Sequence, residues 1–211
     1  MTRTHCERCG QCCQKGGPAL HHWDMDLFER GVLDYRHVYT LRKGELVRDQ
    51  FKDALVPLDR EIVKVKGRGS GWTCIFYDRQ AKACSIYKHR PLECVDLKCW
   101  DLRDLEDIYD RDRITRGHLI SEKSALWEII ADHEKRCAVS LLDELSSAME
   151  TRDRKEAAER INVLVRYDQA VRDLMRERVG LGEDELDFLF GRPLPRILRQ
   201  FGTLSRLKAT G

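Results

Sequence analysis

The sequence has no long apolar segment. None of its apolar runs approaches the roughly 20 residues that a membrane-spanning helix needs. The stretch from Met1 to Gly10 lacks the apolar region of about 7–15 residues found in export signals. We therefore expect a cytoplasmic protein without a membrane span. The net charge is only +2 over 211 residues, so no global excess of positive charge predicts a nucleic-acid partner.

The sequence also lacks the loops of nucleotide-binding enzymes. The segment from Gly67 to Gly71 is rich in glycine, but it has neither the GxGxxG spacing nor the Walker lysine. No serine–histidine–aspartate set and no catalytic pair of carboxylates is recognisable. Catalytic and cofactor-binding residues therefore stay unknown, and enzymatic activity stays open, with no machinery recognised apart from the metal site argued below.

Cysteine, in contrast, is abundant and clustered, with nine residues in the chain. An odd number of cysteines, two of them adjacent, and the expected cytoplasmic location argue against a disulfide framework. Metal binding or redox chemistry is the better interpretation. The candidate metal ligands form one group at the start of the chain and a second group further on, and they are Cys6, Cys9, Cys12, Cys13, Cys74, Cys84, Cys94 and Cys99.

The spacing of the first group leaves the metal open. Crowded thiolates repel one another unless a cation neutralises them. The CxxCxxC spacing is similar to that of ferredoxin loops, which hold an iron–sulfur cluster, but here the fourth cysteine follows at once. Zinc sites more often use separate CxxC pairs with four ligands per ion. We prefer an iron–sulfur cluster over zinc, and the thiols exceed the needs of either single centre.

Periodicity predicts short strands first and helices later. A hairpin is expected where 38–42 and 46–48 flank a turn at Lys43 to Glu45, and further strands are expected at 61–66 and 72–77. One long helix is expected from Ser121 to Met149. A second helix follows, with Asp153 and Glu156 as a capping box and a stop near Gly180. Shorter helical pieces are expected at 185–191 and 195–201.

These elements predict an α+β protein in two parts. A small cysteine-rich metal-binding domain with a few short strands occupies residues 1–115, and an α-helical C-terminal region occupies residues 116–211. The tail beyond Gly191 is basic and contains Leu194, Ile197 and Phe201. It is a candidate surface for a protein partner, although a solvated face is the default interpretation.

The cysteine pattern resembles a known family, the CxxCxxCC cysteine-cluster proteins (the YkgJ type), a zinc- or iron-chelating domain. The resemblance covers about the first hundred residues. It consists of Cys6, Cys9, Gly10, Cys12 and Cys13, then Asp26 to Phe28 and Gly31, then Gly71, Cys74 to Phe76, and the run from Cys84 through Tyr87, Arg90 and Pro91 to Cys94.

The resemblance implies that the first seven of these cysteines chelate a metal, in a protein with a redox or metal-handling role. Cys94 is followed by Val95 rather than the arginine usual in the family, so Cys99 is an extra candidate that the family pattern does not fix. The domain is also similar to part of bacterial flagellin lysine methylases. A metal-dependent enzyme, or an accessory subunit of a methylase-like protein-modifying system, is the alternative function, although no methyl-donor loop is recognisable.

Five other residues are of interest, and four of them have a simpler interpretation. Cys137 and His133 share the apolar stripe of a predicted helix and are expected to be buried in the core. His21 and His22 follow the first cysteine group and are expected to be exposed to solvent. Arg90 could either donate hydrogen bonds to thiolate sulfur or cap a turn, and general principles do not separate these roles.

Overall fold

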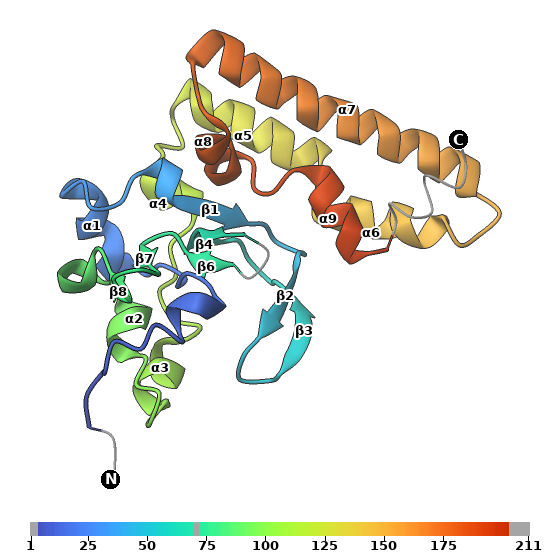
Figure 1. Cartoon of the computed structure of the whole chain (residues 1–211). Helices are drawn as coiled ribbons and strands as arrows, with labels where there is room; N and C mark the ends of the chain where they lie inside the picture. The colour runs from blue at the N-terminus through green and yellow to red at the C-terminus, as the bar shows by residue number, and fades with distance from the viewer. Residues whose placement is uncertain (1–3, 70–71, 203–211) are drawn as a thin grey trace.

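The computed structural model describes residues 4–69 and 72–202 (Figure 1). About 48% of the chain is helical and 15% lies in short strands, which confirms the predicted α+β class. The longer helices gather on one side of the molecule, and the strand pairs and the first short helices lie on the other side (Figure 1).

Within residues 4–69 and 72–202, the strands form four antiparallel pairs. The first pair joins β1 (Val38–Leu41) to β4 (Ile62–Val65), and the second joins β2 (Leu46–Asp49) to β3 (Ala54–Pro57). Two shorter pairs follow, β5 (Gly67–Arg68) with β6 (Thr73–Cys74), and β7 (Tyr77–Asp78) with β8 (Ala83–Cys84).

The predicted hairpin around Lys43 to Glu45 is wrong in its pairing, because β1 pairs with β4 and β2 pairs with β3. The cause is Glu45, which is fully buried and accepts a hydrogen bond from the backbone N–H of Arg42 at 2.9 Å. Gly44 then donates to the carbonyl of Leu58 at 2.8 Å. The chain therefore leaves β1 and forms a separate β2–β3 hairpin.

In the part of the chain that the structure describes, four short helices come first: α1 (Met25–Glu29), α2 (Leu92–Asp96), α3 (Arg103–Ile108) and α4 (Arg116–Leu119). Five more follow, α5 (Ala125–Arg136), α6 (Val139–Ala148), α7 (Arg154–Val179), α8 (Glu183–Leu189) and α9 (Leu194–Gln200). Short 3₁₀ turns connect several elements, among them η1 (Cys13–Lys15) and η4 (Tyr87–His89). Both α5 and α6 pack against α7 (Figure 1).

The expected single helix from Ser121 to Met149 is two helices, α5 and α6. The first of them, α5, has Ser124 as its N-cap, and the Ser124 hydroxyl accepts a hydrogen bond from the backbone N–H of Trp127. The helix breaks at Cys137 because the carbonyl of that residue accepts a hydrogen bond from Arg42 Nη1 at 3.1 Å, and Ala138 is extended. A periodic apolar stripe continues across this break, so the sequence pattern does not reveal it.

The long helix α7 is predicted well at its end and less well at its start. Gly180 ends the helix in the left-handed region, with φ +77°, as expected for a C-terminal glycine. Asp153 is the N-cap, but its side chain makes no capping hydrogen bond, so the expected capping box with Glu156 does not form.

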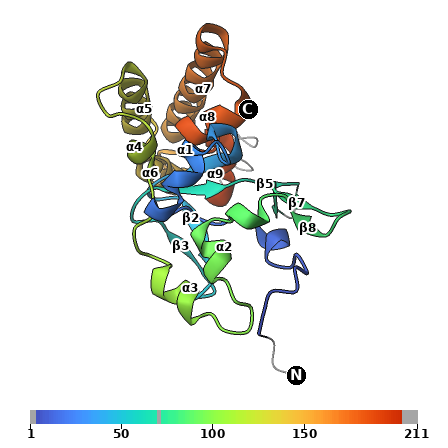
Figure 2. The same ribbon diagram turned by 90° about the vertical axis from the view of Figure 1, so that its left-hand side faces the viewer.

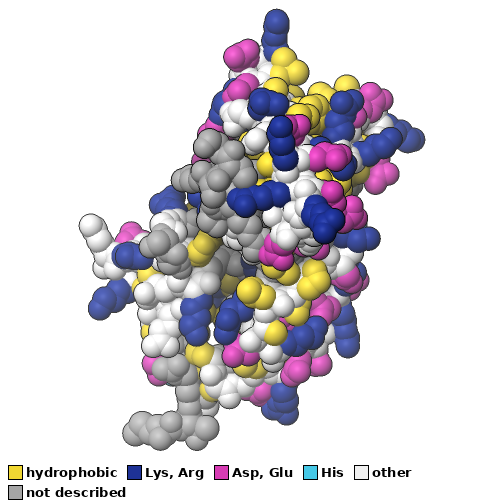
Figure 3. All heavy atoms as spheres, turned by 90° about the vertical axis from the view of Figure 1, so that its right-hand side faces the viewer, with side chains coloured by type: hydrophobic (Ala, Val, Ile, Leu, Met, Phe, Trp, Pro, Cys, Tyr) yellow, Lys and Arg dark blue, Asp and Glu magenta, His cyan; other side chains and the backbone are white. Residues whose placement is uncertain are grey.

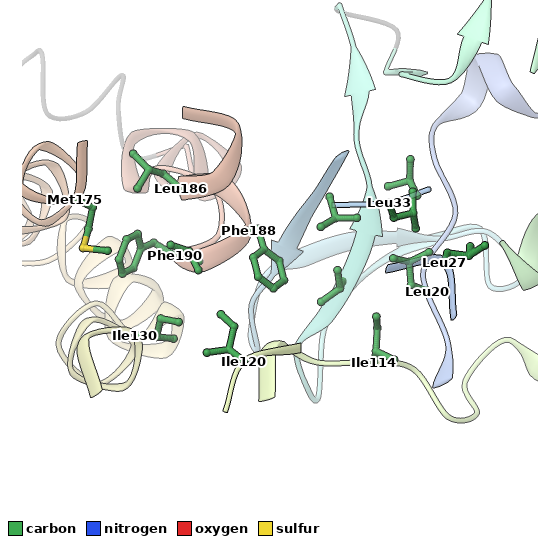
Figure 4. Packing of buried hydrophobic residues seen from close by; sticks show 14 of the residues in the cluster. Leu20, Leu27, Leu33, Ile114, Ile120, Ile130, Met175, Leu186, Phe188 and Phe190 are labelled. Carbon is green, nitrogen blue, oxygen red and sulfur yellow. The ribbon is translucent and has the colours of Figure 1, made fainter. Parts of the chain in front are cut away.

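One hydrophobic cluster joins residues on both sides of residue 115. Leu20 and Leu33 from the first part of the chain share this cluster with Met175 and Phe188 from the helical part (Figure 4). Helix α8 lies against β1, where the Thr40 hydroxyl donates to the carbonyl of Phe188 at 2.6 Å. The division into 1–115 and 116–211 stays a prediction, and the two segments share a core.

A buried arginine adds a polar link across the same boundary. Arg116 is 2% exposed, and its guanidinium donates to Glu61 Oε2 at 3.0 Å, to Glu134 Oε2 at 2.8 Å and to the carbonyl of Leu189 at 2.7 Å. The guanidinium thus ties the segment before β4 to α5 and to the end of α8. A buried charge of this kind costs several kcal/mol unless it is paired, and here it is paired twice.

A second hydrophobic cluster contains the first part of the predicted basic tail. Leu194, Ile197 and Leu198 of α9 are fully buried against α6 and α7. The apolar face of this segment therefore packs on the protein itself, and the remainder of the basic tail, with Arg206 and Lys208, lies outside the described residues. A protein partner for this region stays a prediction.

The surface carries both signs of charge. On the face shown in Figure 3, lysine and arginine side chains are interspersed with aspartate and glutamate and with small hydrophobic patches. Within the described part of the chain, no helix combines the length and the apolar character required to cross a bilayer.

Candidate metal centre

Gly10 sets the path of the first cysteine loop. Its φ is +75°, and a Cβ added at this position would lie 2.2 Å from Tyr77 Oη. Only glycine allows the loop to pack this closely on the Tyr77 ring. Tyr77 pairs with Cys84 in the β7–β8 hairpin. The conformation of one glycine therefore brings the loop that carries Cys12 onto the hairpin that carries Cys84 (Figure 2).

The end of the loop meets the other short strand pair. The turn η1 begins at Cys13 and packs against β6, which contains Cys74. The Cys12 and Cys13 sulfurs are 3.9 Å apart. The hydrogen bond between the two thiols lowers the pKa of Cys12 to about 6, with a smaller contribution from Arg90, whereas the same bond raises the pKa of Cys13. Cys12 is therefore the thiol of this pair that loses its proton at the lower pH.

Backbone N–H groups two residues later act on three of the thiols. Arg8 N donates to Cys6 Sγ at 3.4 Å. Burial raises the pKa of Cys74 and Cys84, and the N–H groups of Phe76 and Ile86 oppose that rise. Backbone donors to sulfur are a common support of thiolates bound to metal.

The predicted strand at 72–77 is broken into two pieces. Ile75 and Phe76 separate β6 from β7, and the N–H of Ile75 donates to the carbonyl of Lys66 at 3.1 Å. The strand prediction is therefore correct for the local character of the segment and wrong in its continuity.

Cys94 is placed by a polar network under the start of α2. Asp24 Oδ1 accepts a hydrogen bond from the backbone of Leu92 at 2.8 Å, and Glu93 Oε2 accepts one from the backbone of Ala19, also at 2.8 Å. His21 Nδ1 donates to the carbonyl of Arg111 at 2.7 Å, and its Nε2 lies 3.5 Å from Glu93 Oε1. The first turn of α2 is thus fixed to the segment that follows the cysteine loop (Figure 2).

The predicted exposure of His21 is wrong, because its side chain is 2% exposed within this network, whereas His22 is exposed as expected. Asp24 and Glu93 also help to position the site, and the sequence alone did not indicate this role for either residue. The Glu93 position next to Cys94 is the signal that could have identified it, since a buried acid beside a thiol needs partners.

Five thiols lie close enough for their charges to affect one another. Burial raises the pKa of Cys94 well above its ordinary value, and the charges of Cys74, Cys12 and Cys84 raise it further. The charge of Cys94 in turn raises the pKa of Cys13. The two cysteine groups therefore meet in space: Cys12 and Cys13 come from the loop, and Cys74, Cys84 and Cys94 come from the second group.

The remaining predicted ligands are placed differently. Cys6, Cys9 and Cys99 are exposed. Cys137 is fully buried beside His133, far along the chain in the second hydrophobic cluster, as expected. Among the residues that the structure describes, no three cysteine, histidine or acidic side chains already surround a common metal-binding point. The ligand set stays a prediction, and the thiols would have to move closer together to coordinate an ion.

One arginine from the cysteine loop and one from the second cysteine group stack on the same tyrosine ring. The guanidinium carbons of Arg8 and Arg90 lie 4.1 Å and 3.9 Å from the centre of the Tyr87 ring. Cation–π contacts of this kind stabilise by about 0.5–2 kcal/mol each. The charge of Arg90 helps to lower the pKa of Cys12 and partly offsets the rise in the pKa of Cys84. The hydrogen bond from Arg90 to thiolate sulfur stays a prediction.

The residues present fit a metal held by thiolates. Arg90 Nε is buried and has no hydrogen-bond acceptor among the described residues, and the charge of its guanidinium acts on the Cys12 and Cys84 thiols. An N–H of this kind is satisfied once an anionic sulfur lies in front of it. The donor set is soft sulfur, which suits zinc and iron–sulfur clusters rather than magnesium or calcium.

The comparison with family models shows to which protein family the chain belongs. A model of the CxxCxxCC family, whose description proposes zinc or iron chelation, matches residues 5–111, half of the chain. The chain belongs to the CxxCxxCC family. The matched range contains all five converging thiols together with Cys6, Cys9 and Cys99, and membership supports metal binding as the general property of this CxxCxxCC domain. No curated protein and no solved structure matches the chain.

Proposed function

We propose that this protein chelates an iron–sulfur cluster or zinc through its clustered cysteines and has a redox or metal-handling role. The observation that carries the proposal is the meeting of the two cysteine groups, in which Cys12 and Cys13 approach Cys74, Cys84 and Cys94. Thiolates gathered in one place repel one another, so these five thiols cannot all ionise there without a cation.

An iron–sulfur cluster is the preferred occupant. The CxxCxxC spacing of Cys6, Cys9 and Cys12 is similar to that of ferredoxin loops. A single zinc ion and a single cluster each take four thiolates, so the number of converging thiols does not separate them. The buried N–H of Arg90 and the backbone donors to Cys74 and Cys84 would stabilise the added negative charge of a cluster. The same donors would also support zinc thiolates, so the choice depends on measurement.

The exposed positions of Cys6 and Cys9 support a handling role. Thiols at the surface of the loop are within reach of a metal or a partner in solution, whereas a purely structural site is closed by its protein ligands. We propose that these two residues capture the metal and that the inner thiols retain it.

The experiment is to purify the full chain without oxygen, quantify iron, zinc and acid-labile sulfide, and record the visible spectrum. A brown protein with iron and sulfide in comparable amounts is the expected result. A colourless protein with stoichiometric zinc would replace the cluster by zinc, and a colourless protein without either metal would refute the proposal.

Two matched variants locate the site. Cys94→Ala is expected to lose most of the bound metal, because it removes a thiol at the meeting point. Cys137→Ala removes a thiol that is also buried but lies in the second hydrophobic cluster, and it is expected to keep the metal. Equal metal content in both variants, with far-ultraviolet circular dichroism unchanged, would contradict the assignment.

A further inference from the structure

An open pocket lies directly beside the thiols. It has a volume of about 400 Å³ and is lined by Arg8 from the cysteine loop and by residues 84–89 from the end of β8 and η4. Cys84, one of the five converging thiols, forms part of its wall. A volume of this size lies within the range of small-molecule sites, about 300–1,000 Å³.

The pocket wall is cationic and holds no acidic side chain. Within the part of the chain that the structure describes, no ion pair joins Lys88 or Arg8 to an acid. Lys88 is exposed, and Arg8 lies over the Tyr87 ring. Positive side chains gathered without counter-ions around a concave surface favour an anionic ligand.

The histidine of the pocket is oriented as a donor. Arg30 Nη2 lies 3.2 Å from His89 Nδ1, and Arg30 is itself paired with Asp26 at 3.0 Å. A guanidinium can only donate, so His89 Nδ1 is the acceptor of this bond and the proton of the neutral ring is on Nε2. His89 Nε2 therefore carries an N–H rather than a lone pair, which suits an anion and disfavours a metal ligand.

We propose that this pocket binds a small polycarboxylate that carries the incoming metal, and that it presents the ion to the neighbouring thiols. This inference rests on the proposed metal-binding function. Carboxylates hold divalent ions through hard oxygen ligands, whereas thiolates are the softer donors and bind zinc and iron(II) through sulfur. Lys88, Arg8 and His89 would receive the carboxylates, and Cys84 is the thiol adjacent to them.

The transfer step is a ligand exchange. The divalent ion leaves the carboxylate oxygens and bonds to thiolate sulfurs, and each thiol that becomes a ligand releases one proton to solvent. The polycarboxylate then leaves as a free anion. The charge of the ion does not change, so the step needs no oxidant or reductant.

Calorimetric titration of citrate into the metal-free full chain, kept reduced and free of oxygen, tests the pocket. Lys88→Gln is expected to weaken citrate binding about tenfold, which corresponds to 1.4 kcal/mol, because one charge-assisted contact is lost. Lys82→Gln is the matched control, since Lys82 is also an exposed lysine of the same segment but does not line the pocket. It is expected to bind citrate like the unchanged chain.

Absence of citrate binding, or an equal loss in both variants, would overturn the proposal. Inorganic phosphate that binds as tightly as citrate would overturn the polycarboxylate assignment, and a glutamate-rich peptide that binds more tightly would replace it with a protein partner.

A second measurement separates this proposal from the metal-binding function. Lys88→Gln is expected to slow the transfer of zinc from zinc citrate while the zinc affinity, measured by competition with a chelating dye, stays unchanged. Zinc transfer that is unaffected by Lys88→Gln would overturn the delivery role. If the chain binds citrate but neither zinc nor iron, the pocket assignment stands and the proposed metal-binding function is refuted.

Discussion

Replacing Gly10 by alanine is expected to weaken metal binding while the fold persists. The residue has φ +75°, and the left-handed conformation costs a residue with a Cβ about 1–2 kcal/mol. The new Cβ would also lie 2.2 Å from Tyr77 Oη, far inside van der Waals contact. Relief of such overpacking typically costs a further ~1–3 kcal/mol. If the loop must adopt its present path to hold the metal, affinity falls at least ~30-fold.

The assay is a zinc competition with a chelating dye on reduced, oxygen-free protein, with urea unfolding measured in parallel. Gly180→Ala is the matched control, because Gly180 has φ +77° and nothing lies within 4 Å of an added Cβ. This control carries the conformational cost without the clash. It is expected to lower the free energy of unfolding by about 1 kcal/mol and to leave zinc affinity unchanged.

A double variant separates the two costs. Tyr77→Ala in the Gly10→Ala background removes the atoms with which the Cβ collides, so zinc affinity is expected to recover relative to Gly10→Ala alone. The remaining loss is then the conformational cost and the loss of the Tyr77 ring, which the single Tyr77→Ala variant measures. Wild-type affinity in Gly10→Ala, or no recovery in the double variant, would refute the role of this contact.

Three further changes test other parts of the structure. Arg116→Ala leaves Glu61 and Glu134 without their buried partner and is expected to lower the free energy of unfolding in urea by about 3–5 kcal/mol; Arg136→Ala, which breaks an exposed pair with Asp132, is expected to cost less than about 1 kcal/mol. Asp24→Ala removes the acceptor for the backbone of Leu92, so a loss of ~1–2 kcal/mol and weaker metal retention are expected, and unchanged retention would separate α2 from the site. Burial raises the pKa of Asp168, but the hydrogen bond with His133 and the charge of Arg172 outweigh burial and bring this pKa below its ordinary value. Its stabilisation is therefore present above about pH 4 and lost as the pH falls through the lower folded value, and Asp168→Asn should show a flatter acid dependence in urea titrations below pH 4.

The local elements could be predicted from sequence, and the long-range partners could not. Alternation identifies the strand at 61–66, and Gly180 identifies the end of α7, because both signals are local. The pairing of β1 with β4, and the break between α5 and α6, depend on buried side chains that reach across the fold. Glu45 turns the chain away from β1, and Arg42 takes the carbonyl of Cys137.

The candidate site divides in the same way. The spacing of the cysteines and the family resemblance identify the thiols, and the structure brings five of them together. The role of Gly10 depends on a contact with Tyr77, which is 67 positions away in the sequence. The burial of His21 likewise depends on Glu93 and on the carbonyl of Arg111. No pattern within a short window contains such information.

The central claim is that thiols from both cysteine groups hold one metal centre. Its most direct test is alkylation of the reduced full chain under native conditions, before and after metal removal, with each cysteine quantified by mass spectrometry. We expect Cys12, Cys13, Cys74, Cys84 and Cys94 to be protected in the metal-loaded protein and to become reactive once the metal is removed, while Cys137 stays protected in both. Reactivity of these five thiols that is the same with and without metal would contradict it.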